Sequence, residues 1–400
     1  MKAVEIKPDI FWVGAVDWNN RDFHGYSIKK GTTYNAYLVR DEKTVLFDTV
    51  RQGFKGDLLH HLRQLIEPEK IDYIVVNHVE LDHSGCLPEL IELIKPEKIF
   101  CSPMGKKVLL EHFHRPDWPL EVVKTGDQIE LGRRTVRFIE TRMLHWPDSM
   151  FSYIPEEKLL ISSDAFGQHW ATSQRFDDEV DQAELLAHSA KYYANILLLY
   201  SPLVEKLLAQ VQADGLEIEM IAPDHGLIWR RNPSAILEAY QRWSSQQARS
   251  KAVIIYDSMW HSTEKMAKAV LSGLQDEGIK EISLLHARKN HRSDIMTEVL
   301  EAGAVILGSA TLNNNIMPAM ADVLTYMKGL RPKNKIGAAF GSFGWSGEAV
   351  KHLNGYLEEM GVELVGEGVR IKNVPTHETL ADCVELGHSI ARALNGTAGR

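Results

Sequence analysis

Four side chains that can bind a metal ion lie within six consecutive residues. They are His78, Glu80, Asp82 and His83. The run before them, 71–76, is largely apolar and rich in β-formers, which predicts a buried strand. The four side chains would therefore lie on a loop just past the carboxyl end of a strand, where rigid scaffolds often present functional groups. This pattern predicts a metal site.

Three later segments repeat the pattern of an apolar strand that delivers one possible ligand. These ligands are His145, Asp164 and His225. Together with the first cluster they make seven candidates, enough for two metal ions. Asp164 is the natural bridge, because the two oxygens of a carboxylate can bind two metals at once. Imidazole with several carboxylates is a harder ligand set than the thiolates of structural zinc sites, and it favours iron or manganese.

Length and composition describe an ordinary globular chain. The 400 residues are enough for two or three domains, and the 44% hydrophobic and 25% charged residues give no sign of disorder. The net charge of −9 argues against a nucleic-acid partner, which normally leaves a basic footprint. No apolar run is long enough to predict a transmembrane helix, and the first residues lack the apolar core of a signal peptide.

The cysteines and the remaining histidines predict no further site. Cys86, Cys101 and Cys383 are scattered and odd in number, so a disulfide framework is not expected and a reducing cytoplasm fits best. No Cys-x-x-Cys pair is present, so the chain has no rubredoxin-type or iron–sulfur site of its own. The histidines of 60–61 and 112–114 are predicted to lie on solvated helix surface.

The first half of the chain, 1–250, mixes short strands with helices, which predicts a layered α/β sandwich. Strands are expected over 31–39, 44–49 and 134–140, and helical spacing appears in 55–66, 86–94, 183–198 and 233–246. The polar run 244–251 predicts a linker.

The second half, 251–400, is a regular alternation of strands and helices. Apolar strands are expected over 252–256, 304–308 and 335–341, each followed by a polar loop and then a helix. This alternation predicts a parallel, doubly wound sheet, whose ligands bind beyond the carboxyl ends of the strands.

Three loops in this half could hold a flavin nucleotide. They are Ser258, Met259, Trp260, His261, Ser262 and Thr263 after the first strand; Thr311, Leu312, Asn313 and Asn314 after the second; and Ser342, Phe343, Gly344, Trp345, Ser346 and Gly347 after the third. The first loop opens a helix, whose free N–H groups and dipole favour a phosphate. The others combine backbone donors with aromatic rings that could flank an isoalloxazine. No Gly-x-Gly-x-x-Gly fingerprint opens a βα unit, so direct oxidation of NAD(P)H is not supported.

The metal motif resembles His-x-His-x-Asp-His of the metallo-β-lactamase superfamily, with Glu80 in place of the second histidine. That replacement, the run 145–150 and the run 164–168 resemble the flavodiiron proteins over essentially the whole chain. The resemblance implies a metallo-β-lactamase-like αββα sandwich with two irons, followed by a flavodoxin-like domain with FMN. The first loop departs from the flavodoxin pattern Thr-x-Thr-Gly-x-Thr, with Trp260 at the third position and His261 at the glycine.

The resemblance also assigns the ligands. One iron would be held by His78, Glu80, His145 and Asp164, and the other by Asp82, His83, Asp164 and His225, with His83 the least secure because some members leave it off the iron. His24 resembles a histidine near the open face of the site that is not a ligand, and Tyr193 could supply a hydroxyl to the same pocket.

The expected reaction is reduction of dioxygen to water, or of nitric oxide to nitrous oxide. An external one-electron donor such as rubredoxin is implied, and so is a head-to-tail homodimer or a dimer of such dimers. Two alternatives remain at this point. A lactamase-fold hydrolase would use a metal-activated water, and a simple electron carrier would use only the flavin half.

Overall fold

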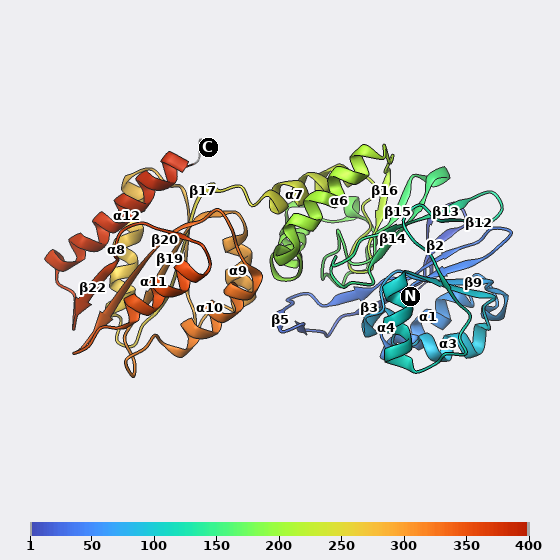
Figure 1. The fold of residues 1–400 in the computed structure, drawn as a ribbon, viewed down its shortest axis with the longest axis horizontal. Coiled ribbons are helices and arrows are strands. Elements are labelled where there is room, and N and C mark those ends of the chain that lie inside the picture. Colours follow the sequence, from blue (N-terminus) through green and yellow to red (C-terminus); the bar gives the residue numbers. More distant parts are fainter. Residues whose placement is uncertain (1, 398–400) are drawn as a thin grey trace. The chain divides into compact units, whose positions relative to one another are not determined.

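The computed structural model describes residues 2–397 and divides them into two compact units, shown in Figure 1. The first unit runs through Tyr192 and resumes at Pro202–Gln241. The second comprises Tyr193–Ser201 and the chain from Arg242 onward. A short segment from inside the first half of the sequence thus belongs to the second unit, which a single boundary near residue 250 does not anticipate.

A seven-stranded sheet forms one layer of the first unit, in the order β1–β2–β7–β8–β9–β10–β11. The strands are β1 Val4–Lys7, β2 Ile10–Trp12, β7 Tyr37–Val39, β8 Val45–Phe47, β9 Tyr73–Val76, β10 Lys98–Cys101 and β11 Leu120–Val122. From β8 to β11 the strands are parallel, so their carboxyl ends meet at one edge of the sheet.

A five-stranded sheet forms the second layer, in the order β12–β13–β14–β15–β16. The strands are β12 Gln128–Glu130, β13 Thr135–Glu140, β14 Met150–Ile154, β15 Leu159–Ile161 and β16 Met220–Ala222. β14 runs antiparallel to β15, and β15 runs parallel to β16. Because Ser152 pairs with Ile161 and Ile161 with Ala222, the start of β14 and the ends of β15 and β16 share one edge.

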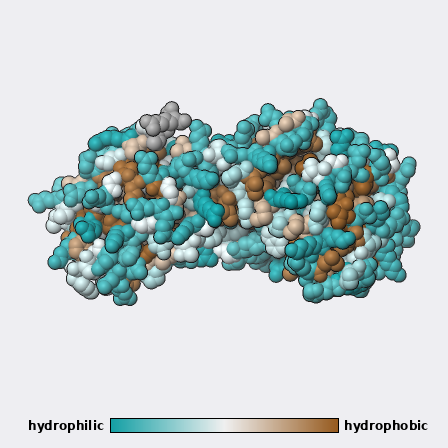
Figure 2. All heavy atoms as spheres, viewed as in Figure 1, coloured by the Kyte–Doolittle hydropathy of each residue, from teal (hydrophilic) through white to brown (hydrophobic). Residues whose placement is uncertain are grey.

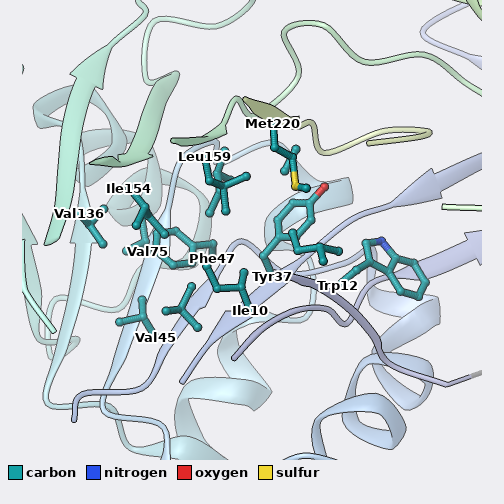
Figure 3. Packing of buried hydrophobic residues seen from close by; sticks show 14 of the residues in the cluster. Ile10, Trp12, Tyr37, Val45, Phe47, Val75, Val136, Ile154, Leu159 and Met220 are labelled. Atoms are coloured by element: carbon teal, nitrogen blue, oxygen red, sulfur yellow. The ribbon is translucent and has the colours of Figure 1, made fainter. Parts of the chain in front are cut away.

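The core of the first unit lies between these two sheets. Figure 3 shows side chains from both layers packed together: Ile10, Trp12, Tyr37, Val45, Phe47 and Val75 from the first sheet, and Val136, Ile154, Leu159 and Met220 from the second. All belong to one buried cluster. Removing this apolar surface from water stabilises the layer pair by about 25 cal/mol per Å².

Helices complete the αββα layers, which confirms the predicted fold class of this half. They are α1 Lys55–Leu62, α2 Leu81–Ser84, α3 Leu87–Ile94, α4 Pro103–Phe113, α5 Gln182–Tyr192, α6 Ser201–Ala213 and α7 Pro233–Ser245. Figure 1 shows α1 and α3 beside β9, and α6 and α7 beside β16. In α3 the buried residues are Leu87, Leu90, Ile91 and Ile94, the spacing of one helix face.

Several expectations for the first half are wrong in detail. The predicted strand 31–39 is two strands, because β6 (Thr32–Tyr34) pairs with β3 (Ala15–Asp17) and β7 joins the large sheet. The chain leaves β6 at Asn35, whose N–H donates to the carbonyl of Asp224. Another error concerns His61, which is buried with Nδ1 2.9 Å from the Gly14 carbonyl instead of lying on solvated surface.

Several shorter pieces complete this half of the chain. The hairpin of β4 (Asp22–Phe23) and β5 (Tyr26–Ser27) is antiparallel. The predicted helix 183–198 is α helical only to Tyr192 and continues as a π-helical segment, Tyr193–Leu197. The predicted linker 244–251 is shorter than expected, because α7 ends at Ser245 and the next strand begins at Arg249.

The second unit is a parallel sheet in the order β18–β17–β19–β20–β21, with β22 also paired to β20. The strands are β17 Arg249–Asp257, β18 Glu281–His286, β19 Ala302–Ser309, β20 Ile336–Phe343, β21 Glu363–Leu364 and β22 Val369–Lys372. The helices are α8 Ser262–Asp276, α9 Arg292–Leu300, α10 Pro318–Leu330, α11 Ala349–Glu359 and α12 His377–Thr397. Figure 1 shows α8 beside α12, with α9, α10 and α11 on the other side of the sheet.

This arrangement confirms the predicted doubly wound sheet. The core includes apolar residues of β17, β19 and β20 with one face each of α8 and α12. The face in Figure 2 is mostly hydrophilic with scattered apolar patches. Within residues 2–397, no helix combines the length and the apolar character needed to cross a membrane.

Candidate metal centre and flavin loops

The seven predicted metal ligands are gathered in the first unit by its strand ends. His78, Glu80, Asp82 and His83 follow β9, His145 lies between β13 and β14, Asp164 follows β15, and His225 follows β16. The shared edge of β14, β15 and β16 explains why residues far apart in sequence come together. They form two groups of potential ligand atoms.

The first group comprises His78, Glu80, His145 and Asp164. Nε2 of His145 lies 3.2 Å from Glu80 Oε2 and 3.1 Å from Asp164 Oδ2. Nε2 of His78 lies 3.3 Å and 3.4 Å from the same two oxygens. Two imidazole nitrogens and two carboxylate oxygens therefore converge on one point.

The second group comprises Asp82, His83 and His225, and the other oxygen of Asp164 faces it. Nε2 of His83 is 3.2 Å from both Asp82 Oδ2 and Asp164 Oδ1. Nε2 of His225 is 3.2 Å from Asp82 Oδ2 and 3.4 Å from Asp164 Oδ1. Asp164 thus directs Oδ2 to the first group and Oδ1 to the second, the geometry of a bridging carboxylate.

The chemistry of these atoms fits a pair of metal ions. Asp164 Oδ1, His145 Nε2, His83 Nε2 and both oxygens of Asp82 are buried without a well-formed hydrogen bond. Burial alone would lower the pKa of His83, but the carboxylates of Asp82 and Asp164 raise it to about 10. Burial would raise the pKa of Asp164, yet the neighbouring His83 charge holds it well below its ordinary value. Carboxylates and imidazoles arranged in this way are the donor set that a metal ion binds, and metal binding to such ligands releases protons.

Hydrogen bonds behind the first group fix its ligands. Asp148 Oδ2 lies 3.0 Å from His78 Nδ1 and accepts from the N–H of Val79 at 2.7 Å. This contact leaves His78 Nε2 directed at the metal position, as carboxylate–histidine pairs do in metal sites. Buried Asp48 accepts from Asn77 N and, at 3.3 Å, from His78 N, which holds the backbone of the ligand run.

The second group is fixed in the same way. His225 Nδ1 donates to the carbonyl of Thr33 at 2.6 Å, so Nε2 faces the centre. Asp224 Oδ2 lies 3.8 Å from His83 Nδ1 on the side away from the metal position. Burial and the charge of Asp48 raise the pKa of Asp224 well above its ordinary value. The sequence reasoning did not single out Asp48, Asp148 or Asp224, although the last two adjoin predicted ligands.

A cavity of about 230 Å³ opens onto both groups. Residues that line it include Phe23, His24, Tyr34, Arg51, Glu80 and Asp82. His24 Nε2 lies 2.6 Å from Glu80 Oε1. This is the carboxylate oxygen of Glu80 that does not face the first group. His24 therefore contacts a ligand and reaches the cavity without joining either group of potential ligand atoms.

Two aromatic residues that the sequence reasoning missed lie against the second group. The ring of His169 is 4.6 Å from that of His225, and its Nδ1 is 2.7 Å from Thr32 Oγ1. The ring of Tyr192 is 5.2 Å from His169 and 6.3 Å from His225. Burial lowers the pKa of His169 well below its ordinary value.

The predicted Tyr193 has a different environment from Tyr192. It belongs to the second unit, where its hydroxyl lies 3.0 Å from Ser201 Oγ and its ring is 5.5 Å from that of Trp243. A pair of adjacent tyrosines offers no pattern that tells which one faces a neighbouring pocket, because the chain changes from α to π helix between them.

The three predicted flavin loops lie at one edge of the second unit's sheet. They follow β17, β19 and β20, which are neighbouring parallel strands. In the first loop, Ser258 Oγ is buried without a partner, and Thr263 Oγ1 is 2.9 Å from Ser342 Oγ of the third loop. Ser262 begins α8, so hydroxyls and free N–H groups form a cradle that fits a phosphate.

The loops also present aromatic rings to solvent. Trp260 is 82% exposed and Trp345 is 89% exposed, while Met259 is 44% exposed. A face left open between such residues fits a flat, apolar ring system. In the second loop, Asn313 and Asn314 take positive φ values of 50° and 58°, and Thr311 Oγ1 accepts from Ala349 N. The structure thus brings together residues of all three predicted loops.

Comparisons with known proteins agree with this description of both units. Residues 32–226 match the model of the ODP family beta lactamase, and residues 254–387 match that of flavodoxin. The chain is therefore a lactamase-like metal domain joined to a flavodoxin domain.

Relatives over the whole length define the family. The rubredoxin-oxygen oxidoreductase of Megalodesulfovibrio gigas is 50% identical over 397 residues, and the nitric oxide reductase of Moorella thermoacetica is 49% identical over 393 residues; each match covers 98% of both chains. The solved flavodiiron protein of Giardia intestinalis is 33% identical, covers 100% of this chain and 98% of its own, and has a TM-score of 0.95. The chain belongs to the flavodiiron protein family.

Proposed function

We propose that this protein is an oxidoreductase that reduces dioxygen to water and nitric oxide to nitrous oxide at one dinuclear centre. The observation that carries the proposal is Asp164, whose two oxygens face two separate groups of ligands. The cavity beside Glu80 and Asp82 gives a small gas access to both groups. The names of the two relatives above support the two substrates in turn.

Iron fits the donor set, since four imidazoles and three carboxylates make a mixed, fairly hard environment. His78, Glu80, His145 and Asp164 would hold one iron, and Asp82, His83, Asp164 and His225 the other. Bound iron would supply electrons and open coordination positions for the gas. Three negative ligands against two divalent cations leave a net charge of +1 (4 − 3), which avoids a large uncompensated charge in a buried site.

Residues of the chain itself handle protons and exclude water. His24 holds a proton between its Nε2 and Glu80 Oε1, at the cavity wall. Phe23 covers the second group, with its ring 5.3 Å from His225 and 4.3 Å from His169. His169 packs against the ring of His225, and Tyr192 packs against His169.

FMN fits the loops of the second unit. Ser258, Ser262 and Thr263 would hold its phosphate, and Trp260 and Trp345 would lie against its ring system. The other residues of the three predicted loops, between Met259 in the first loop and Gly347 in the third, would supply backbone contacts. When bound in these loops and at the two groups of ligands, reduced FMN and two ferrous ions would together supply the four electrons that dioxygen requires.

The electrons would come from an external one-electron donor such as rubredoxin. The three cysteines, Cys86, Cys101 and Cys383, are buried and scattered, so they offer no Cys-x-x-Cys centre of the chain's own, and they fit a reducing cytoplasm. We further propose a head-to-tail homodimer, or a dimer of such dimers, in which the exposed indoles of one subunit are covered by its partner. Residues 1–250 would carry the metal chemistry and residues 251–400 the flavin.

The test is to reduce the purified protein without air and follow the consumption of each gas. Metal analysis and the spectrum of the released flavin should give about two irons and one FMN per chain. Zinc alone in a fully active preparation would contradict the iron assignment. Thioester or lactone hydrolysis that does not depend on flavin reduction would favour a metallohydrolase. FMN without any bound metal in the purified protein would favour a simple electron carrier.

A further inference from the structure

The cavity has two different walls beside the metal groups. On the wall of the first group, Glu80 Oε1 is paired with His24 at 2.6 Å. On the wall of the second group, Asp82 Oδ1 has no hydrogen-bond partner. Tyr34 and Arg51 line the same cavity as Asp82. His24 thus contacts the ligand Glu80 of the first group, whereas Asp82 Oδ1 of the second group has no such partner.

Arg51 brings a permanent positive charge to this wall. A guanidinium stays protonated at any pH a protein meets and offers five N–H donors in a planar fork. The Tyr34 hydroxyl, followed by the carboxylates of Asp17 and Asp82, raises the pKa of Arg51 still further, so these groups surround it. Among the residues that line the cavity, Arg51 is the one with a permanent positive charge.

The Tyr34 hydroxyl, which contacts Arg51, is also held by a second group. The Tyr34 hydroxyl donates to Asp17 Oδ2 at 3.1 Å, while Asp17 Oδ1 accepts from the N–H groups of Asn19 and Asn20. The Tyr34 ring packs edge-on against His225, with centroids 6.0 Å apart. Tyr34 therefore links Arg51, which lines the same cavity, to the side of the site near His225.

The proposed reaction needs a counter-charge at this place. Four electrons and four protons convert one dioxygen to two waters, and two electrons and two protons convert two nitric oxides to nitrous oxide and water. Each electron that arrives before its proton leaves negative charge on oxygen. Fixed donors aimed at developing charge are a large source of catalysis in a partly desolvated site.

We propose that Arg51 is an anion-binding residue of this cavity. It stabilises negative charge on oxygen at the Asp82 side, opposite His24, and it binds small inorganic anions such as azide at the same place. The proposal rests on the proposed function for the identity of the natural oxyanion. The binding of azide does not depend on turnover.

The experiment measures azide binding to the oxidised, iron- and FMN-loaded protein through its visible metal-centre absorption. Arg51→Ala should weaken azide binding by roughly tenfold or more, since a charged hydrogen bond is lost. Arg51→Lys should recover part of the affinity, because the charge returns without the planar fork. The matched control is Arg63→Ala, which removes the same charge from an exposed position that does not line the cavity; azide affinity should stay within about twofold.

Equal azide affinity in the parent and Arg51→Ala would overturn the proposal, whatever the turnover. So would an equal loss in Arg63→Ala, which would make the effect general surface electrostatics. Iron and FMN content measured in each variant separates a lost anion contact from a lost centre. Failure of the proposed function would look different, because the parent protein would bind azide normally but consume neither gas.

Discussion

The metal centre and the flavin loops both lie at strand ends, but the functional side chains are buried in the first, whereas the tryptophans of the second are exposed. At the metal centre the functional groups are side chains: His78, His83, His225 and Asp164 are all at most 1% exposed. In the flavin loops the most prominent groups are open to solvent, with Trp345 at 89%. A metal needs several deprotonated atoms converging on one point, and only a packed interior can hold them there.

The two regions also differ in how they balance charge. The carboxylates and imidazoles of the first unit lie 3.1–3.4 Å apart, so their opposite charges compensate each other within the two groups. The flavin loops rely on neutral hydroxyls and on the N-terminus of α8, with Thr263 and Ser342 linking two loops. A single substitution should therefore abolish metal binding at the whole centre, whereas a single substitution in the flavin loops should only lower the affinity for FMN.

The largest effect is expected for Asp164→Ala. Loss of the shared carboxylate leaves two like-charged cations without their bridge, so one or both irons and all gas reduction should be lost. FMN content should stay at that of the parent, since the flavin loops belong to the other unit. Metal analysis and flavin extraction on the same preparation check this, with the exposed Asp214→Ala as control. Full activity in Asp164→Ala would refute the bridge.

The next largest effect is expected for His24→Ala. The variant loses the group 2.6 Å from Glu80 Oε1 and keeps all ligands, so iron content and flavin reduction should persist. Turnover with dioxygen should fall by roughly 10²-fold, the usual effect of removing one donor to developing charge. Nitric oxide turnover should fall less, because fewer protons are needed. Turnover within about twofold for both gases would make His24 an ordinary loop residue, and loss of iron would make it a ligand.

The corresponding substitution in the flavin loops of the second unit is Thr263→Val. The substitution keeps the shape but removes the hydroxyl that is 2.9 Å from Ser342 Oγ in the buried base of the cradle. FMN affinity should fall by about tenfold, the effect of one lost buried hydrogen bond. Fluorescence titration of the flavin-free protein measures it, and the iron content should not change. If Thr263→Val also lost iron, the two regions would not be independent.

The sequence predicted the residues of the two groups because most of them follow apolar strands; His145 is the exception, since it lies in the turn between β13 and β14 and not after a strand. Parallel β15 and β16 necessarily bring Asp164 and His225 to one edge, and local pattern reveals both strands. It could not predict which buried polar groups would support them. Asp48 reaches His78 only through the pairing of β8 with β9, and His169 meets His225 only because the loops after β15 and β16 fold together.

The same limit explains the errors in the fold. β18 was not anticipated, because it lies at a sheet edge and its residues are only partly buried. The break between β6 and β7 depends on the hydrogen bond from Asn35 to Asp224, almost two hundred residues away. Tertiary contacts of this kind override local propensity, and no window of sequence contains them.

The two adjacent tyrosines allow a sharper test of the metal centre. The ring of Tyr192 lies near His169 and His225, whereas Tyr193 packs on Trp243 in the second unit. Tyr192→Phe should slow gas turnover several-fold with iron retained, since one polar group leaves the wall of the site. Tyr193→Phe is the matched substitution, and its turnover should change less. A larger effect at Tyr193 would restore the assignment made from the sequence.

The smallest effect is expected at the start of α8. His261 has a φ of 66°, a conformation that costs a non-glycine residue roughly 1–2 kcal/mol, and its side chain mainly contacts Glu264 on the surface. His261→Gly should therefore raise the stability of the second unit by about 1 kcal/mol, less than the full strain because glycine is more flexible when unfolded. Iron content should not change.

The opposite substitution in the third flavin loop completes this test. Gly347 has a φ of 86°, and a Cβ there would approach the Phe343 ring to 3.1 Å. Gly347→Ala should therefore destabilise the second unit by about 1 kcal/mol or more, because the strain that His261→Gly removes is added here. Denaturant unfolding followed by flavin fluorescence compares the two variants with the parent. If both variants shift stability in the same direction, backbone strain does not determine the stability effects at these two positions.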